Sequence, residues 1–213
     1  MKNIIVLVAA MLSLSVSAQK DKRATSILDE MSKQFSNMKS MSASFSYDVD
    51  NGQKKITETY NGDVTVKGMK FRLKMAGQEI FANGKEMFTY VKEANEVNVT
   101  DFDPNSKSNL DLTKIYTIYK KGYKYVFVEE VKEGSNFYEV VELSPENANA
   151  DITKVQIRVN KKDKTVKSWK IWHKNGKKEM FRVNKFTPNP PADDSIFTFD
   201  KKKYPGVEVV DLR

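Results

Sequence analysis

Cysteine is absent from the 213-residue sequence, and histidine occurs only once, at His173. The absence of cysteine excludes disulfides, thiol catalysis and cysteine-ligated metal sites. His173 precedes the turn signal Asn175-Gly176, and no partner for a catalytic triad or a metal cluster is in view. We therefore predict a surface histidine at a hairpin edge and no catalytic residue there.

Motifs for binding phosphate or calcium are also missing. The nine glycines lie at predicted turns and form no Gly-rich phosphate loop. Asp101, Asp103 and Asn105 resemble the start of a calcium loop, but Ser106 stands where glycine is needed and Leu112 where the closing glutamate belongs. These absences favour a protein that is not an enzyme and that uses neither a metal nor a cofactor.

Acidic residues are in the minority, since 28 Asp and Glu against 36 Lys and Arg give a formal net charge of +8. Lysines occur in pairs at predicted turns, such as Lys54-Lys55 and Lys177-Lys178, rather than along one face. This distribution predicts solvated loops and no nucleic-acid partner. Docking against anionic lipid or an acidic partner is the alternative.

Residues 1–18 have the pattern of a cleaved secretory signal peptide. Lys2 precedes the apolar run Ile4–Val16, and Val16 and Ala18 occupy the small-residue positions before the cut. The run is shorter than the roughly 20 residues of a membrane-spanning helix, which disfavours the alternative of an uncleaved anchor. Gln19 rather than cysteine follows the expected cut, so the predicted mature domain, 19–213, has no lipid-modified end.

Hydrophobic periodicity predicts one helix followed by many strands. Apolar residues recur at helical spacing at Ile27, Met31 and Phe35, and beyond Ser40 the period becomes two. Strands are predicted at 45–49, 64–66, 69–75, 79–82, 86–91, 96–100, 123–131, 137–143, 153–159, 166–172, 179–186 and 196–199. From these segments we predict a meander of about ten or eleven antiparallel strands.

Turn chemistry separates the strands. Asn51-Gly52, Asn83-Gly84 and Asn175-Gly176 are dipeptides that favour type I′ hairpins. The Thr187–Pro191 stretch, which contains three prolines, predicts an extended loop, because proline cannot pair in a central strand.

One segment interrupts the strand pattern. Leu112, Ile115, Tyr116 and Tyr119 fall on one helical stripe, which ends at Gly122. A helix inserted midway through a meander covers one side of the sheet. We therefore predict a mainly β protein with some α structure: one strongly curved antiparallel sheet with two helical elements over its concave face.

Methionine and aromatic side chains are abundant in the predicted mature domain. Methionine is flexible and polarizable, which suits a surface that accommodates variable apolar ligands. A curved sheet closed by helices can enclose a cavity. Ordinary core packing is the alternative interpretation of these residues.

Several segments resemble the outer-membrane lipoprotein carrier proteins, the LolA-type periplasmic chaperones. The resemblance covers nearly the whole predicted mature domain. The segments that carry it are Ser42-Ala43-Ser44-Phe45, Asn61-Gly62-Asp63-Val64, Phe71-Arg72-Leu73, 82–90, Leu143-Ser144-Pro145, Ser168-Trp169-Lys170-Ile171, Phe197-Thr198-Phe199 and 205–209.

The resemblance implies an unclosed β-barrel of about eleven strands with a helical lid and no enzymatic activity. It also implies a monomer in the periplasm that takes acylated lipoproteins from an inner-membrane exporter to an outer-membrane acceptor. The expected cavity wall consists of Phe45, Tyr47, Met69, Phe71, Leu73, Met75, Phe88 and Tyr90. The expected lid consists of Ile27, Met31, Phe35, Leu112, Ile115, Tyr116 and Tyr119.

One position departs from the family pattern. Relatives carry an arginine after the Val66-Lys67 pair that hydrogen-bonds the lid, and here that residue is Gly68. We therefore expect the lid to close mainly through apolar contact of the Ile115/Tyr119 stripe with the sheet.

Other functions of the same fold remain open. They are a periplasmic carrier or sensor of free lipids, glycolipids or lipoproteins, an enzyme on the same scaffold, and a structural envelope protein whose hollow is simply core.

Overall fold

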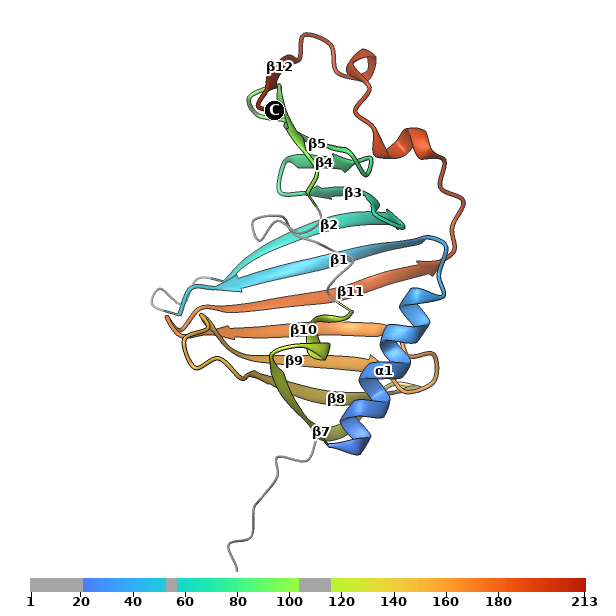
Figure 1. Cartoon of the computed structure of the whole chain (residues 1–213), viewed down its shortest axis with the longest axis vertical. Helices are drawn as coiled ribbons and strands as arrows, with labels where there is room; N and C mark the ends of the chain where they lie inside the picture. Colours follow the sequence, from blue (N-terminus) through green and yellow to red (C-terminus); the bar gives the residue numbers. More distant parts are fainter. Residues whose placement is uncertain (1–20, 53–56, 104–115) are drawn as a thin grey trace, which may run out of the picture.

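The computed structural model describes residues 21–52, 57–103 and 116–213. Its main feature is one curved, unclosed sheet of twelve strands (Figure 1). The helices are α1 (Lys22–Ser36) and the 3₁₀ turns η1 (Ile118–Lys120), η2 (Asp194–Phe197) and η3 (Lys201–Lys203). The strands are β1 (Met41–Asp50), β2 (Thr57–Lys67), β3 (Lys70–Met75), β4 (Gln78–Ala82), β5 (Glu86–Val91), β6 (Glu96–Asp101), β7 (Tyr123–Glu133), β8 (Asn136–Pro145), β9 (Ile152–Asn160), β10 (Val166–His173), β11 (Lys178–Pro188) and β12 (Glu208–Asp211).

The strand order is β12-β6-β5-β4-β3-β2-β1-β11-β10-β9-β8-β7. The chain thus builds two antiparallel arms, β1 to β6 and β7 to β11, which join where β1 pairs with β11. This confirms the predicted curved sheet but corrects the simple meander. β12 pairs parallel to β6, and this strand was not predicted. The predicted strand at 196–199 is wrong, since that stretch includes the end of η2.

Helix α1 begins at the N-cap Asp21, whose Oδ1 accepts hydrogen bonds from the backbone N–H of Arg23 and Ala24. Its buried face includes Ile27, Leu28 and Met31, at the spacing of one helical stripe. Figure 1 shows α1 and η1 lying over the same face of the sheet, in front of β8 to β10. The helix predicted from the sequence is therefore confirmed as one element of a cover.

The predicted type I′ turns are wrong in detail. In Asn51-Gly52, Asn83-Gly84 and Asn175-Gly176 only the glycine has a positive φ, whereas a type I′ turn needs both. Between β3 and β4, Ala76 and Gly77 both have positive φ, at 52° and 77°. This two-residue hairpin therefore uses a pair that the sequence signal does not single out.

Two hydrophobic clusters form on opposite faces of the sheet. The larger cluster lies between the sheet and α1 and includes Leu28, Met31, Leu143, Ile157 and Trp169. The smaller cluster lies on the other face of β4 to β6. The C-terminal segment that connects β11 to β12 covers it (Figure 1). Its members are Phe81, Phe88, Tyr90, Val97, Val99, Phe197, Phe199 and Tyr204.

Among the described residues, no helix is long and apolar enough to cross a membrane.

Candidate functional site

An apolar cavity of about 220 Å³ lies on the face of the sheet that α1 and η1 cover. Its wall comes from β1, β2, β3, β10 and β11, and Tyr116, just before η1, closes it. The lining residues are Met41, Ala43, Phe45, Val64, Leu73, Met75, Tyr116, Trp169, Ile171, Glu179, Phe181, Val183 and Phe186. Glu179 is the only ionisable carboxylate among them.

Strand register places these side chains on one face. Ala43 pairs with Val64, and Val64 pairs with Leu73, so one row of apolar residues crosses β1, β2 and β3. Side chains alternate along each strand, so residues two positions away along the same strand also face the cavity. The alternation of the sequence therefore produces a continuous apolar wall.

A β-bulge adjusts the face of β11. The register between β1 and β11 shifts between Ser44 and Phe45, so that Phe45 pairs with Val183 while Ala43 pairs with Phe186. Val183 and Phe186 are three residues apart and would face opposite sides of a regular strand. The extra residue in the bulge brings both into the cavity wall.

Tyr116 connects the cover to the cavity floor. Its ring stacks on Phe35 of α1, with centroids 3.8 Å apart, and meets Trp169 of β10 edge to face, with centroids 5.7 Å apart. The hydroxyl of Tyr119 donates a hydrogen bond to Oδ1 of Asp29 on α1, at 2.6 Å. The η1 segment and α1 are therefore joined to each other as well as to the sheet.

Two polar groups in this wall lack a good hydrogen-bond partner. Nε1 of Trp169 is buried and has no acceptor in the described part of the chain. The hydroxyl of Tyr116 contacts only Sδ of Met41, at 4.0 Å, among described residues, and a thioether is a weak acceptor. Such groups are uncommon in native interiors, where an unsatisfied buried donor costs about 1–3 kcal/mol.

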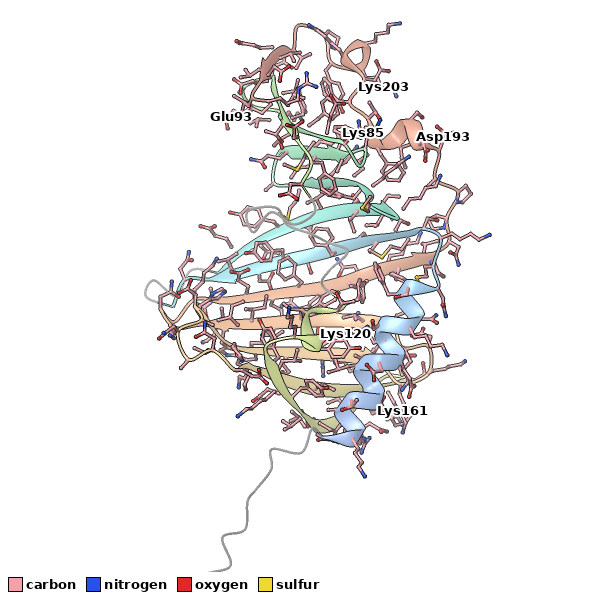
Figure 2. All side chains as sticks on the ribbon, viewed as in Figure 1. Lys85, Glu93, Lys120, Lys161, Asp193 and Lys203 are labelled. Atoms are coloured by element: carbon pink, nitrogen blue, oxygen red, sulfur yellow. The ribbon has the colours of Figure 1, made fainter. Side chains whose placement is uncertain are left out.

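Charged residues hold the N-terminal half of α1 against the sheet. Glu139 of β8 is buried and lies 2.8 Å from Nζ of Lys164 and 3.5 Å from the guanidinium of Arg23. Lys164 also reaches Glu30 of α1, at 3.3 Å. Figure 2 shows Lys161, from the loop that also carries Lys164, beside α1. The attachment of α1 is therefore ionic as well as apolar, which the sequence did not reveal.

A polar group closes one end of the cavity. Glu179 accepts a hydrogen bond from the hydroxyl of Tyr47, at 2.9 Å, and lies 2.6 Å from Nζ of Lys177. Burial disfavours its ionisation, but the hydrogen bonds from Lys177 and Tyr47 outweigh it and lower the pKa of Glu179. Nε2 of His173 lies 3.0 Å from the same carboxylate. His173 lies at the end of β10, as predicted for a hairpin edge, but its side chain is only 20% exposed and contacts a carboxylate.

Five of the eight predicted wall residues lie on or beside the cavity face. Phe45, Leu73 and Met75 line the cavity. Phe71 shares their face and packs against Phe102, and Tyr47 stacks on the lining residue Phe181 with ring centroids 4.3 Å apart.

The other predicted wall residues lie away from the cavity. Met69 is 57% exposed in the turn between β2 and β3. Phe88 and Tyr90 pack against Phe199 in the smaller cluster on the opposite face. We correct their assignment to this wall: β5 is apolar on both faces, so alternation alone could not orient it.

Of the predicted lid, Ile27, Met31, Phe35, Tyr116 and Tyr119 lie in the cover. Leu112 and Ile115 lie outside the described residues. The sequence also failed to nominate the wall residues of β10 and β11, which are Trp169, Ile171, Phe181, Val183 and Phe186. Alternation in these two strands was visible in the sequence, but the bulge hid which β11 residues share a face.

The geometry defines an unclosed β-barrel with an apolar cavity beneath a cover. The family model described as outer membrane lipoprotein carrier protein LolA matches residues 36–200, and the chain belongs to that family. The LolA fold is a binding and carrier fold, and its members are periplasmic. No curated protein matches the sequence.

Three solved structures share the fold at low sequence identity. An uncharacterized conserved protein from Thermus thermophilus has a TM-score of 0.59 at 12% identity, covering 89% of this chain and 99% of that one. LprF from Mycobacterium bovis has a TM-score of 0.53 at 10% identity, covering 82% of this chain and 96% of LprF. MucB has a TM-score of 0.51 at 14% identity, covering 88% of this chain but 65% of MucB.

Proposed function

We propose that this protein is a periplasmic carrier that binds the acyl chains of lipoproteins in the cavity and ferries them from the inner to the outer membrane. The observation that carries the proposal is the apolar cavity beneath α1 and Tyr116, in a chain of the LolA family. Cargo would come from an inner-membrane exporter and pass to an outer-membrane acceptor, with the carrier acting as a monomer.

Cavity size indicates how loading would occur. Ligand pockets for drug-sized molecules measure about 300–1,000 Å³, and this cavity of about 220 Å³ is smaller. It has room for only part of an acyl chain while Tyr116 and α1 cover it. Loading therefore requires the cover to move away from the sheet, which enlarges the cavity.

The chemistry required is transfer between apolar surfaces. Each methylene moved from lipid to water costs about 0.8 kcal/mol, so an acylated protein leaves a membrane extremely slowly without a carrier. The wall combines methionine, aromatic and branched side chains, of which Met41 and Met75 are the most adaptable. Such a wall accepts acyl chains of differing length without a covalent step.

A matched pair of variants on β11 tests the cavity. Val183 lines the cavity, whereas Lys185 pairs with Ser44 and is exposed. Val183→Glu should reduce binding of a fluorescent acyl probe at least tenfold, because it buries a carboxylate in the apolar wall. Lys185→Glu should bind the probe like the unaltered protein. Equal affinity in both variants and the unaltered protein would contradict the cavity as the binding site.

Native mass spectrometry separates the carrier from its rivals. Protein purified from its own periplasm should carry covalently lipidated protein. Bound free lipid or glycolipid instead would indicate the alternative carrier or sensor of the same fold. A ligand-free protein that also fails to bind the acyl probe would indicate a structural role.

We also infer that residues 1–18 are a signal peptide cleaved after Ala18. The apolar run Ile4–Val16 and the small residues before Gln19 support this inference. Intact-mass measurement of the periplasmic protein should give the mass of residues 19–213, and a mass matching the full chain would contradict it.

A further inference from the structure

The two unsatisfied donors of the cavity wall come from opposite sides of it. Nε1 of Trp169 belongs to the floor, on β10, and the hydroxyl of Tyr116 belongs to the cover. The two rings meet edge to face, with an interplanar angle of 75°. The remaining lining is apolar apart from Glu179, so the described protein offers these donors no strong acceptor.

Glu179 does not fill this role. Its carboxylate accepts from Tyr47 and lies within ion-pair distance of Lys177 and His173. These contacts occupy it at one end of the cavity. No described carboxylate of the lining is therefore free to accept from Trp169 and Tyr116.

We propose that the cavity recognises the neutral carbonyl oxygens of acyl esters or amides, which accept hydrogen bonds from Trp169 Nε1–H and the Tyr116 hydroxyl. This rests on the proposed function and specifies its ligand class. A carbonyl accepts hydrogen bonds without carrying a charge, so it enters an apolar wall at lower cost than an ionised fatty-acid carboxylate. A plain hydrocarbon offers no acceptor and leaves both donors unsatisfied.

Carbonyl recognition is coupled to opening of the cover. The side chain of Trp169 is only 7% exposed and its Nε1 atom is buried, so a ligand cannot reach it while Tyr116 remains in place. When Tyr116 moves away from Trp169, both donors become accessible at once. The same movement enlarges the cavity, so chain binding and carbonyl recognition occur in one state.

A rival explanation involves only the protein. The edge-to-face contact would allow the Trp169 N–H to point at the Tyr116 ring, a weak N–H···π hydrogen bond. In that case Trp169 would be partly satisfied in the ligand-free protein and would show no preference for carbonyl-bearing ligands. The two explanations predict different behaviour of the indole proton.

The test compares a diacylglycerol with a dialkyl-ether glycerol of the same chain length, which lacks the carbonyls. Affinities come from displacement of a fluorescent acyl probe. One net hydrogen bond corresponds to about fivefold in affinity, so the unaltered protein should prefer the diacyl lipid by about fivefold or more. Trp169→Phe and Tyr116→Phe should each bring the ratio of the two affinities towards one.

The indole N–H signals give an independent readout. The protein has two tryptophans. Trp172 lies on the other face of β10, where the ammonium groups of Lys154 and Lys170 lie over its ring. With ¹⁵N-labelled tryptophan, the diacyl lipid should move the Trp169 signal downfield and the ether lipid should move it much less. The Trp172 signal is the internal control and should not respond to either lipid.

Three outcomes are distinguishable. A diacyl preference with the Trp169 shift supports the proposal. If Trp169→Phe fails to fold, the ratio of the two affinities in Tyr116→Phe, compared with that of the unaltered protein, still tests the proposal. Equal binding of both lipids overturns carbonyl recognition but leaves the carrier function standing. Binding of neither lipid overturns the carrier function and, with it, this inference.

Discussion

The ring of Phe45 lies against the backbone of its cross-strand neighbour Gly62. A Cβ at Gly62 would stand 2.6 Å from Cζ of Phe45 and 2.7 Å from the carbonyl oxygen of Lys74. Both distances are too short for real contacts, and the second involves backbone that cannot easily move. Glycine at this position therefore allows Phe45 to lie flat in the cavity wall.

Gly62→Ala should lower the free energy of unfolding by about 1–3 kcal/mol, as overpacking does in other cores. It should also weaken binding of the acyl probe, because Phe45 must leave its position in the wall. Urea denaturation and probe titration measure the two effects. The neighbouring exposed variant Asn61→Ala should change stability by less than about 0.5 kcal/mol, and a similarly silent Gly62→Ala would contradict the close contact.

The smaller cluster should contribute to stability without contributing to binding. Phe197 is fully buried on the face opposite the cavity. Phe197→Ala should lower the free energy of unfolding by about 3–5 kcal/mol, the usual cost of a large buried truncation. Under conditions where the variant is folded, its affinity for the acyl probe should equal that of the unaltered protein. A loss of affinity would show that the two faces are coupled.

Polar contacts fix the C-terminal segment over that cluster. The hydroxyl of Tyr204 donates to Oε2 of Glu79, at 2.8 Å, and Arg72 pairs with the same carboxylate. Burial, together with this carboxylate, raises the pKa of Tyr204 to about 12. The segment is therefore attached to β3 and β4 by hydrogen bonds as well as by aromatic packing.

Sequence periodicity was sufficient for most of the fold. The change of period from 3.6 to two near Ser40 located α1 and all strands from β1 to β11, because each of those segments buries one face. It could not give the strand order, since the pairing of β1 with β11 joins residues more than 120 positions apart. β12 was missed because it is a four-residue edge strand with little burial.

The site was harder to predict than the fold. Alternation placed Phe45 and Leu73 correctly, because only one face of their strands is apolar. It failed for Phe88 and Tyr90, because both faces of β5 are apolar. One face packs in the larger cluster, and the other packs against the C-terminal segment. Only the structure could show that Nε1 of Trp169 lacks an acceptor, because no sequence pattern indicates which buried groups lack partners.

Protonation of Asp21 should loosen the start of α1. Hydrogen bonds from the backbone N–H groups of Phe127, Ala24 and Arg23 lower the pKa of Asp21 below its usual value. Because the folded pKa is depressed, this stabilisation is present above the unfolded pKa of about 3.9 and is lost as the pH falls through the folded value. Hydrogen exchange in Lys22–Ser36 should therefore rise between about pH 4 and pH 2.

Two variants separate the roles of the Asp21 oxygens. Oδ1 caps the helix, and Oδ2 accepts from the N–H of Phe127 on β7, at 2.8 Å. Asp21→Ala should lower stability by about 1–2 kcal/mol through loss of the cap. Asp21→Asn keeps a capping oxygen and should cost less, while removing the acid-dependent rise in exchange. Unchanged acid dependence in Asp21→Asn would show that another carboxylate is responsible.

Glu139 and Lys164 should form an energetic unit in the attachment of α1. Their side chains are 8% and 20% exposed, so salt screens this pair less than the ion pair of Arg23, which is 50% exposed. Lys164→Met leaves the carboxylate of Glu139 with only the longer contact to Arg23. It should lower the free energy of unfolding by about 1–3 kcal/mol and raise hydrogen exchange in α1.

The double variant Glu139→Gln with Lys164→Met is the decisive comparison. It removes the uncompensated buried charge, so it should be more stable than Lys164→Met alone. Urea denaturation of the four members of the cycle measures the coupling, which should be at least 0.5 kcal/mol for residues in direct contact. Raising the salt concentration should increase exchange in α1 only modestly, because apolar contacts of Leu28 and Met31 persist. Additive effects of the two substitutions would show that Glu139 and Lys164 do not act as an energetic unit.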